Sequence, residues 1–431
     1  MHGINEFYSI ALPPILPLLL SDLQITYTQA GLLLSVFFLM YSVFQLPAGI
    51  LSDRIGKTRL LVVGMVGMAA GIGLAAMAES YEMLIVSQVV AGISGSTYHP
   101  AGMALISDIE TIDTEGTAMG LFGFGGMVGV AGAPVIVGGV GSYFHWRVGL
   151  AAAVLAGLAG TVLFHVFFDA PATEKRSDVG AAAWRTRGIG DLGRLIRSRV
   201  RAVQATVTVE TVRRTYHETI VAPLSAGIGI LLLATMFVSI QSRAIQTFTT
   251  SYVTLFDGGS AWLANTAFLA LLVGGSISSL WAGILADRWS REKLGGVTSV
   301  ITAGILVTLA LVIDVIVVAP ELVRAGALIV AFFVLGNLMY ACVPIKNALV
   351  SERAERTFSG STFGLVQTAS ALGSTIGPAL FGYLATQVSL SIAYPAIGAV
   401  SLLLGGIFFT LFVLQSPPSG SEPLPADASE H

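Results

Sequence analysis

Long runs of apolar residues recur along the whole chain, separated by short polar or charged segments. Each run is long enough to cross a hydrocarbon layer of about 30 Å as an α-helix. Gly and Pro occur inside several runs, which membrane helices tolerate because neighbouring helices satisfy the freed backbone groups. The pattern predicts an all-α membrane protein with twelve transmembrane helices. We expect these helices at residues 3–21, 28–51, 59–77, 82–107, 116–140, 146–168, 223–254, 261–286, 294–316, 322–350, 359–386 and 390–414.

The composition also indicates a chain embedded in lipid. Hydrophobic residues make up 54% of it and charged residues only 11%, against about 25% charged residues in a soluble domain. Mean hydropathy is +0.81. The single cysteine, Cys342, excludes an internal disulfide bond. The first apolar run is too long for a cleavable signal peptide and lacks a cleavage site, so we expect it to span the membrane.

The positions of Lys and Arg predict the orientation. With the N-terminus inside, 18 of the 22 Lys and Arg residues fall in cytoplasmic connections, ten of them between residues 169 and 222. The positive-inside rule is then satisfied, and we expect a multi-pass protein of the inner membrane with both termini in the cytoplasm. The segment 169–222 is interpreted as a basic linker or, alternatively, as carrying a helix on the anionic inner leaflet. Basic residues beside a membrane do not indicate a nucleic-acid partner.

An internal repeat organises the chain. The segment Gly49–Arg59 returns 234 residues later as Gly283–Lys293, and residues 116–140 align with residues 360–384 at a shift of 244. Duplicated halves are a known way of building a secondary transporter. We therefore expect an N-terminal six-helix bundle at 1–168, a cytoplasmic basic linker at 169–222, a C-terminal six-helix bundle at 223–414 and a disordered cytoplasmic tail at 415–431.

These features together resemble the major facilitator superfamily. Twelve helices in two parallel halves, a long basic central loop and the sequence Gly-x-Leu-Ser/Ala-Asp-Arg after the second and eighth helices carry the resemblance over nearly the whole chain. It implies two six-helix bundles related by a pseudo-twofold axis. The sequences His2-x-x-x-Glu6-x-Tyr8 and Gly95 to Pro100 are similar to those of the fosmidomycin-resistance-like branch. A glycine-rich run in the fifth helix is similar to the antiporter motif, although Ala133 stands where Gly is usual.

Ionisable residues inside spanning helices are costly, and are therefore candidates for function. Glu6, His99, Arg243 and Lys346 lie one each on the first, fourth, seventh and tenth helices, which line the central cavity in the family that the chain resembles. Arg243, supported by Lys346, is predicted to bind an anionic group of the substrate. Glu6 and His99 are predicted to carry protons, and His99 also to contact the substrate. The alternatives are a packed histidine beside Pro100, an ion pair that only neutralises the cavity, and a lysine that reaches the inner surface.

Two further sets of residues complete the predicted machinery. Hydrogen bonds to the substrate are expected from Tyr8, Tyr98, Gln241 and Asn347. Contacts that close the inner face must be breakable, because the protein has to open alternately to each side. The resemblance implies that this gating set comprises Gly49, Asp53, Arg54 and Asp108 in the first half and Gly283, Asp287, Arg288 and Glu352 in the second. The alternative is that these charges only fix the topology.

The sequence is therefore interpreted as that of a monomeric secondary active transporter. It is expected to export a small anionic or zwitterionic organic compound or drug in exchange for protons, by alternating access. Proton-coupled uptake of a carboxylate is one alternative, and a membrane sensor without transport activity is another. A primary pump is not expected, because the sequence has no nucleotide-binding motif. An enzyme is not expected, because His99 has no metal-ligand or nucleophile partner at a recognisable spacing. We expect neither a cofactor nor a metal site.

Overall fold

The computed structural model describes residues 1–109, 112–168, 226–256, 260–353 and 359–415. All regular elements within these ranges are helices. The linker expected at 169–222 lies outside the described residues. So does the expected tail, apart from Gln415 at the end of the last helix.

In the described part of the first half, a helical stretch is present for each of the six spans expected there. The elements are α1 (His2–Ser9), η1 (Pro13–Ile15), α2 (Leu16–Asp22), α3 (Tyr27–Ile55), α4 (Lys57–Ala76), α5 (Tyr81–Gly95), α6 (Tyr98–Ile109), α7 (Ile112–Ala133), η2 (Pro134–Gly138), α8 (Gly139–Tyr143) and α9 (Trp146–Phe167). Three stretches are interrupted. Pro13 and Pro14, which lack a backbone N–H, separate α1 from α2. Ser96 and Thr97 separate α5 from α6, and a π-helical turn begins at Pro134.

The second half is built of longer, continuous helices. They are α13 (Ala226–Phe256), α14 (Ala261–Arg288), α15 (Arg291–Val318), α16 (Glu321–Arg353), α17 (Ser359–Gln387) and α18 (Leu390–Gln415). Within the described residues, ten helical stretches are long and apolar enough to cross a membrane. The two expected spans outside these ten are the broken α5–α6 and the Gly-, Ser- and Thr-rich α17. The prediction of an all-α membrane fold is confirmed.

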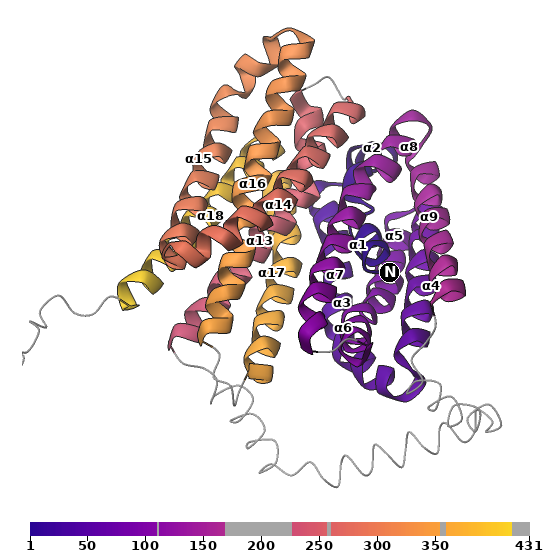
Figure 1. Ribbon diagram of the computed structural model, residues 1–431. Helices are drawn as coiled ribbons and strands as arrows, with labels where there is room; N and C mark the ends of the chain where they lie inside the picture. The colour runs from indigo at the N-terminus through magenta and orange to yellow at the C-terminus, as the bar shows by residue number, and fades with distance from the viewer. Residues whose placement is uncertain (110–111, 169–225, 257–259, 354–358, 416–431) are drawn as a thin grey trace, which may run out of the picture.

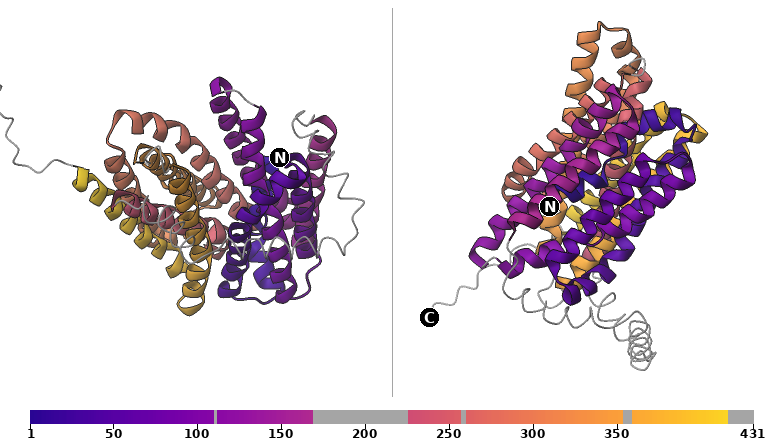
Figure 2. Two further views of the ribbon diagram at one scale, coloured as in Figure 1. Left: turned by 90° about the horizontal axis from the view of Figure 1, so that it is seen from below. Right: turned by 90° about the vertical axis from the view of Figure 1, so that its right-hand side faces the viewer.

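The two sets of helices form two bundles that lie side by side (Figures 1 and 2). Across the boundary α3 packs against α17, and α14 packs against α7 and η2. The sequence repeat makes α3 equivalent to α14, and α7 with η2 equivalent to α17. The contact of α3 with α17 is therefore equivalent to the contact of α14 with α7 and η2. A pseudo-twofold axis between the halves would relate the two contacts in this way.

Close contacts between α3 and α17 lie toward the end of the molecule that holds Asp22 and Tyr27. It is called the outer end here because the orientation rule predicts that it faces the outside. The backbone N–H of Thr28 donates to Thr386 Oγ1 over 2.9 Å, and Ser35 Oγ donates to the Thr375 carbonyl over 2.6 Å. Gly31 packs directly against the Pro378 carbonyl, and a side chain at Gly31 would collide with it. The two bundles are thus closely joined at the outer end.

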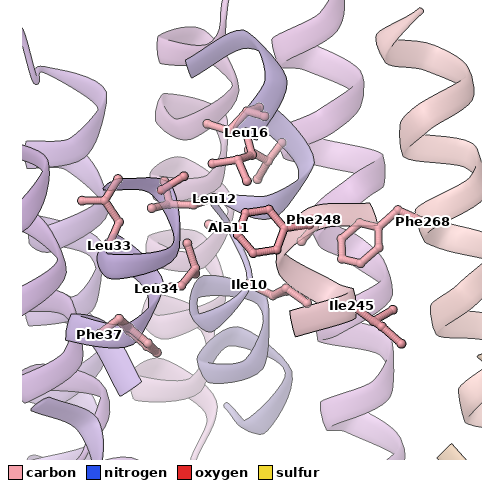
Figure 3. Packing of buried hydrophobic residues seen from close by; sticks show 14 of the residues in the cluster. Ile10, Ala11, Leu12, Leu16, Leu33, Leu34, Phe37, Ile245, Phe248 and Phe268 are labelled. Atoms are coloured by element: carbon pink, nitrogen blue, oxygen red, sulfur yellow. The ribbon is translucent and has the colours of Figure 1, made fainter. Parts of the chain in front are cut away.

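Apolar packing reinforces this junction. Pro13 accepts a hydrogen bond from Thr250, where η1 contacts α13. The surrounding buried cluster combines residues of both halves (Figure 3); it includes Ile10, Leu16, Phe248 and Phe268. Burial of such side chains stabilises a contact by roughly 1.5–3 kcal/mol per residue when water is the alternative environment.

Candidate functional site

A cavity of about 660 Å³ lies between the two halves. Its walls are formed by residues of α1, α3, α6, α13 and α17. The hydrogen bond between Ser35 and Thr375 lies between this cavity and the outer end. We call it the central cavity. It extends toward the end of the molecule that holds Lys57 and Asp108, called the inner end here.

Three of the four predicted ionisable residues line this cavity. Glu6 and His99 belong to helices of the first half, and Arg243 belongs to α13 of the second half. The cavity therefore places one carboxylate, one imidazole and one guanidinium within reach of a single small molecule. Aromatic rings of Phe37, Phe38 and Tyr41 complete the wall contributed by α3.

Glu6 lies between two histidines. Its Oε1 is 3.6 Å from Nε2 of His2, one helical turn earlier on α1, and 3.6 Å from Nε2 of His99 on α6. The Nδ1 of His2 donates to the Phe122 carbonyl over 2.7 Å. The His2 ring is also stacked on Phe122 and on Tyr98, with centroid distances of 3.8 and 5.5 Å. The orientation of His2 is thus fixed from two sides.

A close approach of backbones brings α1 to this position. Gly3 lies against Gly125 and Gly129 of α7, where a Cβ on either Gly3 or Gly129 would collide with the opposite backbone, and Gly126 faces the His2 ring. The glycine-rich run of the fifth span, similar to an antiporter motif, therefore has a local packing role here. It admits α1 beside α7, because glycine leaves room that any side chain would fill.

A buried hydrogen-bond chain connects three helices next to Glu6. Tyr41 of α3 donates to Asn5 Oδ1 over 3.0 Å, and Asn5 Nδ2 donates to the Gly95 carbonyl at the end of α5 over 3.3 Å. Asn5 is fully buried. Sequence reasoning did not select Asn5, although a polar residue beside Glu6 in a spanning helix was an available signal.

Arg243 is oriented by its own helix and by α16. Its Nη1 donates to Gln246 Oε1 over 2.8 Å, and the amide of Gln246 donates to the Tyr340 hydroxyl. The guanidinium carbon lies 4.4 Å from the centroid of the Phe38 ring, across the boundary between the halves. A guanidinium carries five N–H donors, so this arrangement leaves donors for an anionic ligand in the cavity. Sequence reasoning selected Arg243 for this purpose but did not connect it with Tyr340.

The other predicted binding residues lie elsewhere. Lys346 is not among the described residues that line the central cavity; it is buried in α16 and donates to Asn347 Oδ1 over 2.8 Å, while Asn347 itself is exposed. Tyr8 points into the first bundle, where its hydroxyl donates to the Val154 carbonyl over 3.2 Å. Gln241 is buried, and its Oε1 has no hydrogen-bond partner within the described residues.

Ion pairs at the inner end involve part of the predicted gating set. Asp108 pairs with Lys57. Glu352 lies 2.9 Å and Asp287 lies 3.6 Å from the guanidinium of Arg291. Lys57 and Arg291 are equivalent in the repeat, as are Asp108 and Glu352, yet sequence reasoning had selected only the acidic partners.

The remaining gating residues make fewer contacts. The side chains of Asp53 and Arg54 lie outside the described part of the chain, and Arg288 is exposed. A Cβ on Gly49 would make an ordinary contact of 3.6 Å with Pro100 of its own half, and a Cβ on Gly283 would have no neighbour within 4 Å. Neither glycine of the predicted gating set therefore lies at a tight backbone contact between the halves.

The profile described as "Major Facilitator Superfamily" matches residues 2–320 and, in a second overlapping match, residues 231–430. Together these matches cover both halves.

Curated relatives include transporters of different kinds. A "Hexuronate transporter" of Bacillus subtilis is 23% identical over 97% of this chain and 94% of its own length. A "Probable L-galactonate transporter" of Escherichia coli is 32% identical over 29% of this chain and 28% of its own length. The "Multidrug efflux pump LfrA" of Mycolicibacterium smegmatis is 30% identical over 30% of this chain and 26% of its own length.

Solved structures share the fold. A bacterial homologue of the human lysosomal transporter Spinster, in an inward-facing and unoccupied conformation, superimposes with a TM-score of 0.74 at 13% identity, over 97% of both chains. The peptide transporter POT in complex with sulfate superimposes with a TM-score of 0.68 at 16% identity, over 96% of this chain and 94% of that one.

Proposed function

We propose that this chain, which belongs to the Major Facilitator Superfamily and is a multi-pass secondary transporter, moves a small organic anion or drug across the membrane in exchange for protons. One observation carries the proposal. Glu6 of the first half and Arg243 of the second half line the same central cavity, and that cavity lies beyond a closed outer end. A site shared by two halves is accessible from alternate sides when the halves rock against one another.

The substrate class follows from Arg243. Its planar guanidinium is always charged and binds a carboxylate or phosphate through two parallel hydrogen bonds. Phe37 and Phe38 beside it offer apolar contact area. A small anion or zwitterion with an apolar or sugar-like body fits these surroundings. Two relatives are named as transporters of hexuronate and L-galactonate, and both of these compounds are carboxylates. Their names agree with the proposed substrate class.

Proton coupling is assigned to Glu6 and His99. Both side chains are partly exposed to the cavity, with exposed fractions of 18% and 28%. The ionisable groups near them include His2, Arg243, Tyr41 and Tyr98. A proton on this cluster and an anion on Arg243 change the charge of the cavity in opposite senses. Occupancy of one therefore favours binding of the other, which suits uptake of both together. Exchange requires instead that substrate and proton compete for one group, as a cationic group of a zwitterionic substrate would compete with a proton for Glu6.

Proton-coupled uptake of a carboxylate is the second candidate. The near full-length similarity to a hexuronate transporter favours it, whereas the partial similarity to a multidrug efflux pump and the antiporter-like glycine run favour export. The likeness of His2-x-x-x-Glu6-x-Tyr8 to the fosmidomycin-resistance-like branch stays a prediction in support of export. The direction of transport, export or uptake, does not change which residues are assigned to the site.

We further propose that the protein is a monomer of the inner membrane with both termini in the cytoplasm, the orientation predicted from Lys and Arg. The central cavity then opens toward the cytoplasm, and the junction at Thr28 and Thr386 closes the outside. Cysteine accessibility from each side in intact cells tests this orientation, with Tyr143→Cys expected to label from outside and Lys293→Cys only after permeabilisation.

Transport is tested in proteoliposomes that contain a pH-sensitive dye, with a panel of hexuronates, aldonates, phosphonates and anionic drugs. We expect substrate-dependent proton movement by the wild type, loss of it in Arg243→Gln and substrate exchange without proton movement in Glu6→Gln. Lys293→Gln removes one exposed positive charge away from the cavity and is the matched control. Unchanged coupled flux in both cavity variants would contradict the assigned site, and no flux with any compound would contradict the transport function.

A further inference from the structure

We infer that His2, Glu6 and His99 form a binding site for a divalent transition-metal ion of the Zn²⁺, Co²⁺ or Ni²⁺ class. The metal site lies beside the proposed substrate site in the central cavity. Its assignment depends only on the positions of the three side chains and not on the proposed transport function. The i, i+4 spacing puts His2 and Glu6 on one face of a helix, but the third ligand, His99, lies more than ninety residues away in the sequence. Only the packing of α6 beside α1 brings the three together.

The separations fit a shared metal better than direct contacts. Both nitrogens lie 3.6 Å from Glu6 Oε1, and all three ligand atoms lie within 4.8 Å of one another. A direct hydrogen bond to a carboxylate would be shorter, about 2.7–2.9 Å. Two ligands bound tetrahedrally at about 2.0–2.1 Å from one zinc ion are roughly 3.4 Å apart. Each histidine nitrogen thus stands at about the distance from Glu6 Oε1 that two ligands of one metal ion have.

The hydrogen bond made by His2 also supports a metal site. The Phe122 carbonyl can only accept, so Nδ1 of His2 carries the proton of the 2.7 Å hydrogen bond. In the neutral ring this leaves the Nε2 lone pair directed at Glu6. That nitrogen is buried and has no hydrogen-bond partner within the described residues. Metal-binding histidines commonly donate their other ring nitrogen to a carbonyl in this way, which fixes the tautomer and the ring.

Packing holds the ligands in place before any ion arrives. The His2 ring is stacked on Phe122 and Tyr98, and the His99 ring meets the Tyr41 and Tyr98 rings edge to face. A preorganised site binds more tightly, because less side-chain freedom is lost on binding.

The donor set selects the class of ion. Two imidazole nitrogens and one carboxylate oxygen suit zinc, cobalt, nickel and copper, whereas magnesium and calcium prefer oxygen ligands alone. Three protein ligands leave at least one coordination position for water or substrate. Because Glu6 and His99 line the central cavity, this position faces it. An anion bound to Arg243 has access to the same position.

Metal binding is measured on the full-length protein, purified in detergent without a polyhistidine tag. We expect one Co²⁺ per chain with visible d–d absorption, displaced by Zn²⁺ and unaffected by Mg²⁺. His2→Gln, His99→Gln and Glu6→Gln should each weaken Co²⁺ binding at least about tenfold. His165→Gln, which changes an exposed histidine at the end of α9, is the matched control and should bind as the wild type does.

A second readout needs no variant and so does not depend on folding of the mutants. X-ray absorption of the zinc-loaded wild type should show two imidazole ligands with additional oxygen ligands. Binding that survives both His2→Gln and His99→Gln, or a zinc shell without two imidazoles, would overturn the proposal. Transport is not part of either readout, so failure of the proposed transport function and failure of the metal site give separate results.

Discussion

Arg291 and Glu352 form an ion pair, with 2.9 Å between Nη1 and Oε2, at the inner end of the second half. Lys57 and Asp108 form its counterpart in the first half. Each pair connects the first residue of one helix, α15 or α4, with the end of another, α16 or α6. The two halves therefore share an equivalent ion pair between helices, in addition to the similar charged segments at Gly49–Arg59 and Gly283–Lys293.

Breaking these pairs should affect transport more than stability. The side chains of Arg291 and Glu352 are 29% and 53% exposed, so Glu352→Gln should lower the free energy of unfolding by no more than about 1 kcal/mol. The same amount changes the ratio of two conformations about fivefold, and we expect a several-fold lower transport rate. Arg291→Lys, which keeps a positive charge opposite Glu352 and Asp287, should keep most of the rate. Thermal unfolding and flux assays measure the two effects, and a rate in Arg291→Lys as low as in Glu352→Gln would contradict this account.

Gly31→Ala should force the outer end apart. The added Cβ would collide with the Pro378 carbonyl at the contact of α3 with α17. Spin labels at Gln24→Cys and Val388→Cys, both exposed near that end, report the separation of the halves. We expect longer distances to gain population in Gly31→Ala. Gly304→Ala, where a Cβ would meet no atom within 4 Å, is the control. A distance distribution identical to that of the wild type would show that α17 yields locally instead.

Tyr340→Phe should weaken substrate binding without removing it. The Tyr340 hydroxyl accepts a hydrogen bond from Gln246, which in turn accepts one from Arg243. Loss of one hydrogen bond costs roughly 0.5–1.5 kcal/mol, and we expect KM for an anionic substrate to rise a few-fold with little change in kcat. Arg243→Lys should have a larger effect, because an ammonium cannot form the two parallel bonds of a guanidinium. If Tyr340→Phe lowered kcat and left KM unchanged, Tyr340 would act on the conformational change and not on Arg243.

Tyr41→Phe should destabilise the first bundle. The buried Tyr41 hydroxyl donates to Asn5 over 3.0 Å, and without it the Asn5 carbonyl oxygen loses its donor. An unsatisfied buried acceptor costs roughly 1–3 kcal/mol, which should appear as a lower melting temperature in detergent. Tyr143→Phe removes a hydroxyl from a side chain that is 81% exposed, and should leave the melting temperature unchanged. Equal melting temperatures for both variants would mean that water replaces the Tyr41 hydroxyl.

The gating residues show where sequence reasoning was incomplete. The resemblance to a family implied roles for the acidic residues Asp53, Asp108, Asp287 and Glu352. The structure pairs Asp108 and Glu352 with basic residues at the starts of α4 and α15. The repeat contained this signal, because Lys57 and Arg291 occupy matching positions. Choosing the partner of a charge required the helix ends to be placed in space.

Lys346 and Tyr8 illustrate a different gap. Both were selected because they lie on helices expected to line the cavity. A helix presents only part of its circumference to a cavity, and its rotation about its own axis depends on every neighbour against which it packs. Tyr8 points to α9 and Lys346 is buried within its own bundle, although Glu6 on the same helix as Tyr8 does face the cavity.

By itself, the sequence determined which segments are helical, how the chain is duplicated and which ionisable groups are placed in lipid-spanning segments. The reason is local: a backbone in hydrocarbon must satisfy its own hydrogen bonds, so apolar runs of sufficient length become helices. Only the tertiary structure decided which of those groups share a cavity, which partner each charge has, and that the ligand atoms of His2, Glu6 and His99 lie within 4.8 Å of one another. Those relations depend on helix rotation and on the glycine contacts between α1 and α7, which are properties of packing and not of spacing along the chain.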